Sequence, residues 1–413
     1  MGKRTWMIAV LLLMLLVMSA CSPTPTEAPL PTVTPTSTPA PVTTSGPTTP
    51  LTIATPEAAG LCEAVPMPAV DVRPADETDY FKGADPATAE VIIYEYSDFQ
   101  CPGCAGMAMI VEYFVEENPN ISLVYRHFPL DFHDKAVLTA EAVEAAGTQG
   151  KFWEMHDLLF ARQAEWGISS VTMEQARQLM SDYAVELGLD EAQFNQEMDE
   201  HIYLEKIQAQ ALESRALQLT GTPSFIFNNV PYPSEQMGLS YNGLESFMGI
   251  LGMRQWAEPP AMVVDAAGSY QVTFETSKGD ILVELFPQAA PTHVNNFLFL
   301  AREGWYDGSP FFFVQSDFVA LGGDPSTTGV GYPGYYCTGE EQNLFDRPGL
   351  VGMLANGQFF ITLGADAAQL DGQFPLIGQV VEGLDVALAL TNYTPSDPAA
   401  GTPDLLLGVV VQD

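Results

Sequence analysis

A buried strand that runs directly into a cysteine pair constrains the fold of this chain most. The segment EVIIYEYSDF, residues 90–99, is rich in β-branched and aromatic side chains, which indicates a buried strand. Cys101, Pro102, Gly103 and Cys104 follow, and then apolar residues recur at the spacing of one helix face. Proline suits the first position of a helix, because the N–H that it lacks would have no partner there. The sequence therefore predicts that the cysteine pair opens a helix.

This placement favours a reactive cysteine pair. A helix N-terminus carries partial positive charge and free N–H groups, which stabilise a thiolate and lower the pKa of Cys101. Cys104 lies one turn further on, so it can attack a mixed disulfide on Cys101 and release the partner. An inert structural bridge is the alternative, since secreted proteins often contain disulfides, but so small a loop constrains the unfolded chain little.

A zinc site is not predicted, because zinc would require two further soft ligands. The cysteines Cys62 and Cys337 are remote in sequence, and the five histidines form no cluster with ligand spacing. We expect no metal and no other cofactor. Cys62 and Cys337 either pair with each other or remain unrelated thiols, since connectivity cannot be deduced from sequence alone.

Four ordered segments resemble the DsbA-like branch of the thioredoxin superfamily. They are YEYSDFQCPGC (94–104), YRHFPLDFH (125–133), QGKFWEMHDLLF (149–160) and LTGTPSFIF (219–227). The resemblance covers about residues 85–255 and is far more specific than an isolated cysteine pair. It implies an α/β thioredoxin fold with a helical insertion, and thiol–disulfide exchange on extracytoplasmic proteins.

The resemblance also implies roles for individual residues. Cys101 is the attacking cysteine that becomes linked to the substrate, and Cys104 resolves that link. Pro223 matches the cis-proline that lies against the cysteine pair, and Thr222 presents its backbone to the substrate; a trans proline starting a strand is the alternative. Glu95 matches the buried acid beneath the cysteines, where burial would raise its pKa and suit it to proton exchange with Cys104; the alternative is a side chain in solvent.

The patterns of the second folded region predict an antiparallel β-barrel with flanking helices. The stretch AEPPAMVVDAAG, residues 257–268, marks the boundary between the two regions. After it, YQVTFETSKGDILVELF (270–286) alternates apolar and polar residues on either side of a turn, as in a hairpin. A short helix is expected from residue 291, and further strands at 358–364 and 375–381.

Residues 268–412 resemble cyclophilin-type peptidyl-prolyl isomerases. The resemblance lies in residues 275–312, in LGGDP, in QFFITL and in LDGQFPLIGQVVEGLD. It implies rotation of X-Pro bonds, whose barrier is roughly 18–20 kcal/mol, in an apolar proline pocket with an arginine near the twisting amide. Phe318, Gln358 and Phe360 match pocket positions that are retained here.

The cyclophilin-like segment departs from its family's pattern where the chemistry is carried out. Phe313 stands at the arginine position, within Phe-Phe-Phe-Val, and it belongs to the predicted substrate-binding set. Leu321, Gln369 and Phe374 replace further polar or aromatic pocket residues, and a loop is shortened to LANG. A phenylalanine cannot donate a hydrogen bond, so isomerase activity is expected to be weak or absent while the fold survives.

The N-terminal sequence predicts export. Lys3 and Arg4 precede an apolar run that is short for a membrane span, and MSAC resembles a bacterial lipobox with lipid attached to Cys21. A plain signal peptide or an uncleaved anchor is the alternative. Residues 22–84 form a tether and linker, rich in proline and threonine in the first part, which favour extended geometry.

The predicted architecture is therefore a signal with its lipobox, the tether, two domains and a linker between them; the ranges are 1–21, 22–84, 85–256, 257–267 and 268–413. The leading hypothesis is a lipid-anchored extracytoplasmic folding factor that acts on unfolded or cysteine-containing proteins and proline-containing peptides. A net charge of −37 argues against nucleic-acid binding. The alternatives are a surface ligand-binding lipoprotein with a structural cysteine pair, and a reductase supplied by a membrane redox partner.

Overall fold

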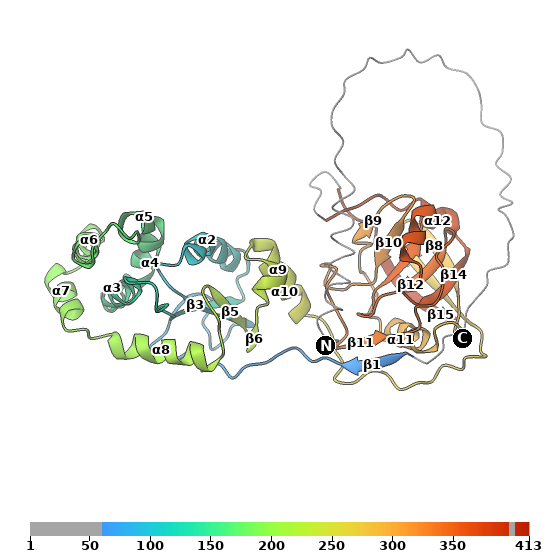
Figure 1. Cartoon of the computed structure of the whole chain (residues 1–413), viewed down its shortest axis with the longest axis horizontal. Coiled ribbons are helices and arrows are strands. Elements are labelled where there is room, and N and C mark those ends of the chain that lie inside the picture. Colours follow the sequence, from blue (N-terminus) through green and yellow to red (C-terminus); the bar gives the residue numbers. More distant parts are fainter. Residues whose placement is uncertain (1–59, 396–400, 413) are drawn as a thin grey trace, which may run out of the picture. The chain divides into compact units, whose positions relative to one another are not determined.

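The structure is a computed structural model that describes residues 60–395 and 401–412 (Figure 1). The predicted signal, Cys21 and most of the predicted tether lie outside the described residues. No helix within the described ranges has the length and apolar character needed to span a membrane. The chain forms two domains of different architecture, and we describe each by itself.

The first domain is built on a five-stranded mixed sheet with the strand order β2-β4-β3-β5-β6. Strands β3 and β4 are parallel, and the other pairs are antiparallel. The strands are β2 (Tyr80–Gly83), β3 (Val91–Ser97), β4 (Ile121–His127), β5 (Ser224–Phe227) and β6 (Val230–Pro231). Strand β2 lies within residues 22–84, which are predicted to be tether and linker, so the ordered sheet begins before residue 85.

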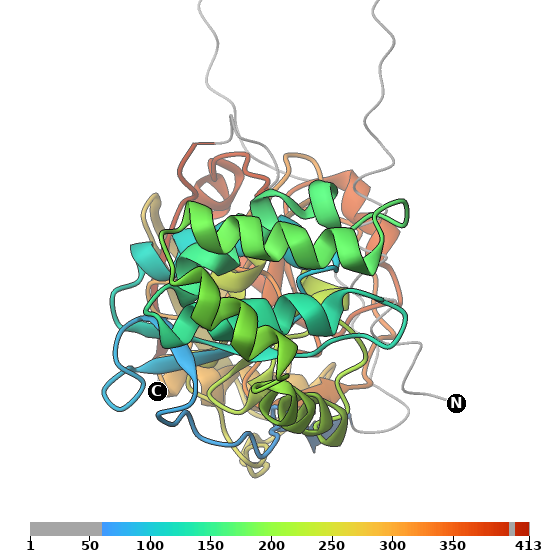
Figure 2. The same ribbon diagram turned by 90° about the vertical axis from the view of Figure 1, so that its left-hand side faces the viewer.

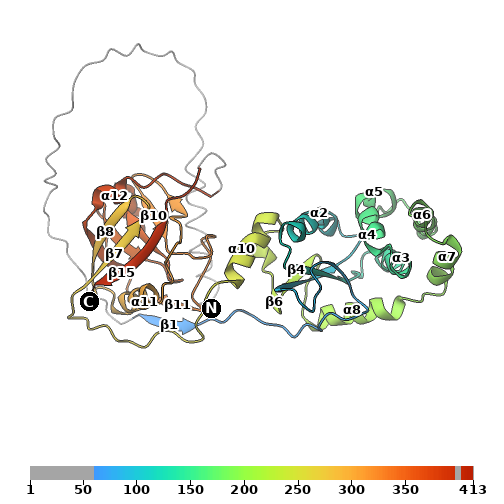
Figure 3. The same cartoon turned by 180° about the vertical axis from the view of Figure 1, so that it is seen from behind.

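Helices cover both faces of this sheet. One face packs against α2 (Pro102–Glu117) and α10 (Tyr241–Leu251) through a shared apolar cluster, and α8 (Leu204–Ala216) contacts β4 on the other side. The short helix α9 (Ser234–Met237) precedes α10. The helices between β4 and β5 form the predicted insertion, which lies beside the sheet in both Figure 1 and Figure 3 and faces the viewer in Figure 2. They are α3 (Ala136–Thr148), α4 (Phe152–Ala161), α5 (Gln163–Trp166), α6 (Met173–Glu186), α7 (Glu191–Asp199) and α8 (Leu204–Ala216).

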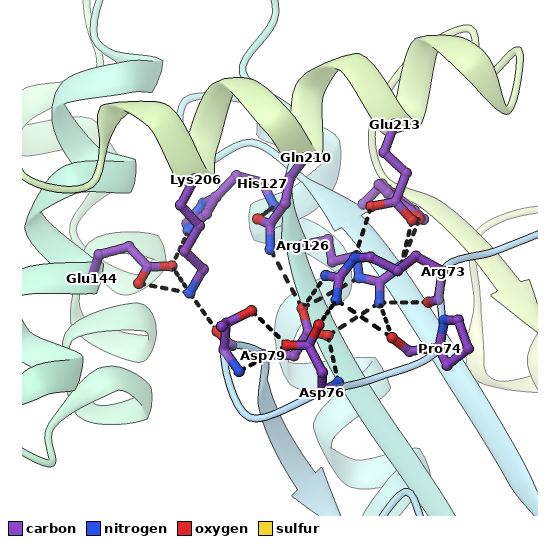
Figure 4. Close-up of polar contacts among 12 residues, drawn as sticks. Arg73, Pro74, Asp76, Asp79, Arg126, His127, Glu144, Lys206, Gln210 and Glu213 are labelled. Atoms are coloured by element: carbon purple, nitrogen blue, oxygen red, sulfur yellow. Dashed lines mark hydrogen bonds and ion pairs between the residues drawn. The ribbon is translucent and has the colours of Figure 1, made fainter.

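A buried arginine attaches the segment before β2 to the sheet. The guanidinium of Arg126, on β4, contacts the carboxylate of Asp79 at 3.1 Å and that of Glu213, on α8, at 2.6 Å (Figure 4). It also donates to the carbonyl oxygen of Arg73 at 2.7 Å. Arg126 is fully buried, so these partners replace the hydration that its charge loses. This network binds the incoming chain, the sheet and the helical insertion together.

The second domain is an eight-stranded antiparallel half-barrel with helices, in agreement with the predicted barrel-like fold. Its strand order is β15-β7-β8-β14-β12-β13-β10-β9, and α11 (Pro291–Arg302), η1 (Ala365–Leu370) and α12 (Leu384–Leu388) accompany it. The hairpin strands β7 and β8 are fully paired. The strands are β7 (Tyr270–Thr276), β8 (Gly279–Leu285), β9 (Phe313–Val314), β10 (Val319–Gly322), β12 (Leu350–Met353), β13 (Phe359–Thr362), β14 (Leu376–Glu382) and β15 (Leu406–Gln412).

A strand from before the first domain completes the second one. Strand β1 (Leu61–Ala64) pairs antiparallel with β11 (Tyr335–Thr338), and Cys62 forms a disulfide with Cys337. The pairing left open by the sequence is therefore a bridge between residues 275 positions apart. Strands β1 and β11 form a two-stranded sheet of their own, so in sequence order the thioredoxin-like region lies between the two halves of that sheet.

Candidate active site

The cysteine pair lies where β3 ends and α2 begins. Cys101 is the residue before the first helical position, its backbone is extended, and Pro102 opens the helix as predicted. The buried carboxylate of Asp98 accepts hydrogen bonds from the backbone N–H of Gln100 and of Leu130. The first bond closes the turn between strand and helix, and the second attaches that turn to the loop after β4.

The two cysteines are free thiols with different environments. Cys101 retains 8% of its accessible surface, whereas Cys104 has none. A hydrogen bond from the Cys104 thiol, together with backbone N–H groups of the first helical turn, lowers the pKa of Cys101 to about 5 although burial opposes the shift. Burial raises the pKa of Cys104 far above its usual value. Cys101 is thus the more readily ionised of the two thiols at neutral pH, whereas Cys104 keeps its proton.

The loop before β5 meets this pair. The bond between Thr222 and Pro223 is cis, as the resemblance implies. The Sγ atom of Cys101 lies 3.3 Å from the carbonyl oxygen of Thr222, to which the thiol donates. A Cβ atom built on Gly103 would touch the Pro223 ring at 3.4 Å, so the proline lies directly against the cysteine turn. The structure therefore brings Thr222 and Pro223 against Cys101 and Gly103, which lie about 120 positions earlier in the sequence.

Glu95 is buried beneath the pair, which excludes the alternative of a side chain in solvent. It is 2% exposed and lies on β3, opposite Tyr125 of β4. Burial raises its pKa to about 7, with the Ser97 hydroxyl opposing the shift. A carboxyl group with such a pKa can take up or give back a proton near neutral pH, as a proton acceptor for Cys104 must.

Two glutamines near the pair were not singled out by the sequence. The side-chain amide of Gln163, from α5, donates to the carbonyl oxygens of Phe99 at 2.7 Å and of Cys101 at 2.9 Å. The amide of Gln100 bridges to Asp134 and to the Gly167 carbonyl. The helical insertion thus supports the cysteine turn directly. No sequence signal marks these contacts, because a glutamine on a short surface helix has no distinctive pattern.

The pH dependence of thiol alkylation should report the low pKa of Cys101. We expect the rate of reaction with iodoacetamide to rise as the pH passes through about 5 and to be nearly constant at neutral pH. The reason is that the thiolate is the reactive form, and an ordinary cysteine forms it only near pH 8.5. Mass spectrometry of the modified peptide measures the rate. A rise centred near pH 8.5 would contradict the prediction.

In the half-barrel, the predicted binding residues form part of one apolar row. Phe313 on β9 pairs with Leu321 on β10, which pairs with Phe360 on β13, so the three side chains lie side by side on one face. Phe360 also packs against the ring of Phe345, and its own ring lies over the backbone of Gly352, where a Cβ atom would fall 2.2 Å away. Position 352 therefore requires glycine.

The remaining predicted residues are also buried near this row. Phe318 lies in the turn between β9 and β10, and Gln358 directly precedes β13. The amide of Gln358 donates to the carbonyl oxygen of Gly331 at 3.1 Å, while its Oε1 atom has no hydrogen-bond partner. Phe313, at the arginine position, is partly exposed and offers no donor. Among the described residues, no group of three or more His, Cys, Asp or Glu side chains is placed to hold a metal ion.

Comparison with known families assigns both domains. Residues 76–241 match a family model described as thioredoxin, and residues 271–406 match the model for cyclophilin type peptidyl-prolyl cis-trans isomerases. The chain is 40% identical over 126 residues to the peptidyl-prolyl cis-trans isomerase ppi1 of Schizosaccharomyces pombe. That match covers 81% of the yeast protein and 28% of this chain. The chain therefore belongs, through its C-terminal domain, to the cyclophilin-type isomerase family, and carries a thioredoxin-like domain before it.

Two further similarities are partial. The chain is 36% identical over 170 residues to the Na(+)/H(+) antiporter NhaA 1 of Salinispora arenicola, a match that spans 41% of this chain and about a quarter, 24%, of that protein. A thioredoxin-like oxidoreductase from Silicibacter pomeroyi is 29% identical, with a TM-score of 0.31, over 38% of this chain and 83% of that one.

Proposed function

We propose that this protein is an extracytoplasmic thiol–disulfide oxidoreductase that acts on unfolded or cysteine-containing proteins through Cys101 and Cys104. One observation carries the proposal: a thiol of lowered pKa at a helix start, which retains 8% of its accessible surface, beside a second thiol that retains none. The first can attack a client and the second can release it. Thr222 presents a backbone carbonyl beside the attacking sulfur, where an extended client segment would lie.

The proposed location rests on the N-terminal sequence. Its basic start, apolar run and lipobox-like MSAC support export and lipid attachment at Cys21 to a bacterial membrane. The Cys62–Cys337 disulfide is consistent with an oxidising compartment. Labelling with a radioactive fatty acid, compared between the natural protein and a Cys21→Ser variant, tests the anchor. Equal labelling of both proteins would refute it.

The direction of exchange depends on the redox potential of the pair. Equilibration with reduced and oxidised glutathione, followed by acid trapping and mass spectrometry, measures that potential. A value well above that of thioredoxin supports an oxidase or isomerase, and a value near thioredoxin's supports a reductase supplied by a membrane partner. Failure of the pair to turn over with any unfolded disulfide protein would favour the surface-binding alternative.

For the half-barrel we propose binding of proline-containing peptides with little isomerisation. The row of Phe313, Leu321 and Phe360 provides an apolar floor, while Phe313 cannot supply the hydrogen bond that stabilises a twisted amide. The family implies isomerase activity. We expect Phe313 to limit that activity, because its side chain has no hydrogen-bond donor. Slow prolyl and disulfide steps occur in the same folding reactions, and a single protein that acts on both is physically sensible.

A Phe313→Arg variant should raise isomerisation. We expect an increase of about a hundredfold, because one well-placed donor contributes roughly 3 kcal/mol to the transition state. The measurement is an isomerisation assay on a proline-containing peptide, with the full-length protein and its variant at equal concentrations. Phe313→Lys serves as control, since it adds charge without the planar donors of arginine. Natural activity equal to that of the Phe313→Arg variant would contradict the prediction.

A further inference from the structure

Three unpaired polar atoms gather beneath Cys104. The Oε1 atom of Glu95, the Oγ atom of Ser97 and the phenol oxygen of Tyr125 are all buried, and none has a partner at full hydrogen-bond geometry. The Ser97 hydroxyl nevertheless lies near enough to Glu95 and Tyr125 to lower the pKa of each. Each such orphan costs about 1–3 kcal/mol, so three in one place is an expensive arrangement. The register of β3 and β4 puts Glu95 opposite Tyr125, and Ser97 follows on the same face of β3.

Cys104 belongs to the same enclosure. It lies in one apolar cluster with Tyr125 and Phe99, and it has no accessible surface. The Ser97 hydroxyl acts on Cys104 by lowering a pKa that burial has raised. Burial raises the pKa of Tyr125 well above 10, so its phenol keeps its proton and remains a donor at every physiological pH. Both hydroxyls therefore lie within electrostatic range of a sulfur that water cannot reach.

The surrounding elements leave these donors free. His156, from α4, packs edge-on against the Tyr125 ring with centroids 5.2 Å apart, but its Nδ1 atom pairs with Asp157. Burial lowers the pKa of His156, so the ring is neutral near pH 7. The carboxylate of Asp98 is occupied by backbone N–H groups and by His133.

We propose that Tyr125 and Ser97 are charge-stabilising donors for the Cys104 thiolate that forms when the mixed disulfide is resolved. This inference rests on the proposed function. It identifies the groups that stabilise the buried thiolate when Cys104 attacks the mixed disulfide. Unpaired donors aimed at the place where negative charge develops stabilise that charge without reorganisation. The two hydroxyls lack partners at full hydrogen-bond geometry in the dithiol state. Each donates a hydrogen bond to the Cys104 thiolate when that thiolate forms.

The resolving step can run in either direction. Cys104 passes its thiol proton to the Glu95 carboxylate, and the resulting thiolate attacks the Cys101 sulfur of the mixed disulfide. The Cys101–Cys104 bond forms, the bond from Cys101 to the client breaks, and the client cysteine leaves with the electron pair and takes a proton from water. The client is reduced by two electrons as the pair is oxidised. In reverse, Cys104 leaves as the thiolate and regains its proton from Glu95.

Ellman's reagent separates the two steps in the full-length protein when Cys101 and Cys104 are reduced and the Cys62–Cys337 disulfide is intact. Attack by Cys101 releases a first thionitrobenzoate, and attack by Cys104 on the mixed disulfide releases the second. For Tyr125→Phe we expect the second phase to slow about tenfold or more, with its pH profile shifted to higher pH, while the first phase is unchanged. Ser97→Ala should have a smaller effect in the same direction.

The control is Tyr94→Phe, a buried tyrosine whose neighbours lie in the cluster on the opposite face of the sheet. It should leave both phases unchanged. A second phase within about twofold of the natural rate in Tyr125→Phe would overturn the proposal, as would an equal slowing of both phases, which would indicate a packing role. If the natural protein released no second thionitrobenzoate, the proposed function itself would fail.

Discussion

Replacement of Cys101 by serine is expected to abolish thiol–disulfide exchange. The loss should be on the order of a thousandfold or more, because a serine hydroxyl does not form the anion that attacks a client disulfide. The assay is oxidative refolding of a reduced, unfolded protein in a glutathione buffer, with disulfide formation followed by mass spectrometry. Residual turnover equal to that of the natural protein would show that the pair is structural.

The matched control for this prediction is Cys104→Ala. Here Cys101 can still attack, but nothing inside the site resolves the product, so a stable mixed disulfide with the client should accumulate. The same substitution removes the hydrogen bond that contributes most to the lowered pKa of Cys101. We therefore expect its alkylation profile to move upward from about pH 5. Together the two variants distinguish the attacking cysteine from the resolving one.

Replacement of Arg126 by methionine should destabilise the thioredoxin-like domain by about 3–5 kcal/mol. Methionine fills a similar volume but leaves the buried carboxylate of Asp79 with Arg73 as its remaining cation. It also removes the donor to the Arg73 carbonyl and to Glu213. Amide hydrogen exchange of β3 and β4 in the full-length chain measures the change, since a multidomain chain does not unfold in a single step.

The control for Arg126 is Arg215→Met. Arg215 pairs with Asp131, but both side chains are largely solvent-accessible at 47% and 89%. An exposed pair contributes at most about 1 kcal/mol, so this variant should leave exchange from β3 and β4 nearly unchanged. Equal effects of the two substitutions would show that the buried network contributes no more than a surface ion pair.

Local patterns predicted the elements that carry the site. The change from a β-branched run to helical spacing located β3 and α2, and proline after Cys101 predicted where the helix begins. The resemblance implied the cis bond before Pro223, and the apolar surroundings of Glu95 implied its burial. These predictions succeeded because each depends on neighbours in sequence or on a motif preserved as a unit.

Contacts between distant segments were not predictable in the same way. The three orphan atoms beneath Cys104 gather only because β3 and β4 pair in one register, which sets Tyr125 against Glu95. Gln163 reaches the Cys101 carbonyl because the helical insertion folds back onto the turn. A pattern of apolar and polar residues specifies which face is buried, but it does not specify which buried residues meet.

The sequence by itself determined the two domain types, the position of the cysteine pair at the start of a helix, and the presence of a phenylalanine at position 313 of the predicted binding set. Only the tertiary structure decided that Cys62 bonds Cys337, that Arg126 binds the segment before β2, and that Phe313, Leu321 and Phe360 form one row. The physical reason is the separation in sequence between the residues that make these contacts. Periodicity and motifs record the preferences of a residue and its neighbours, whereas these contacts join strands and loops whose pairing depends on the packing of the whole domain.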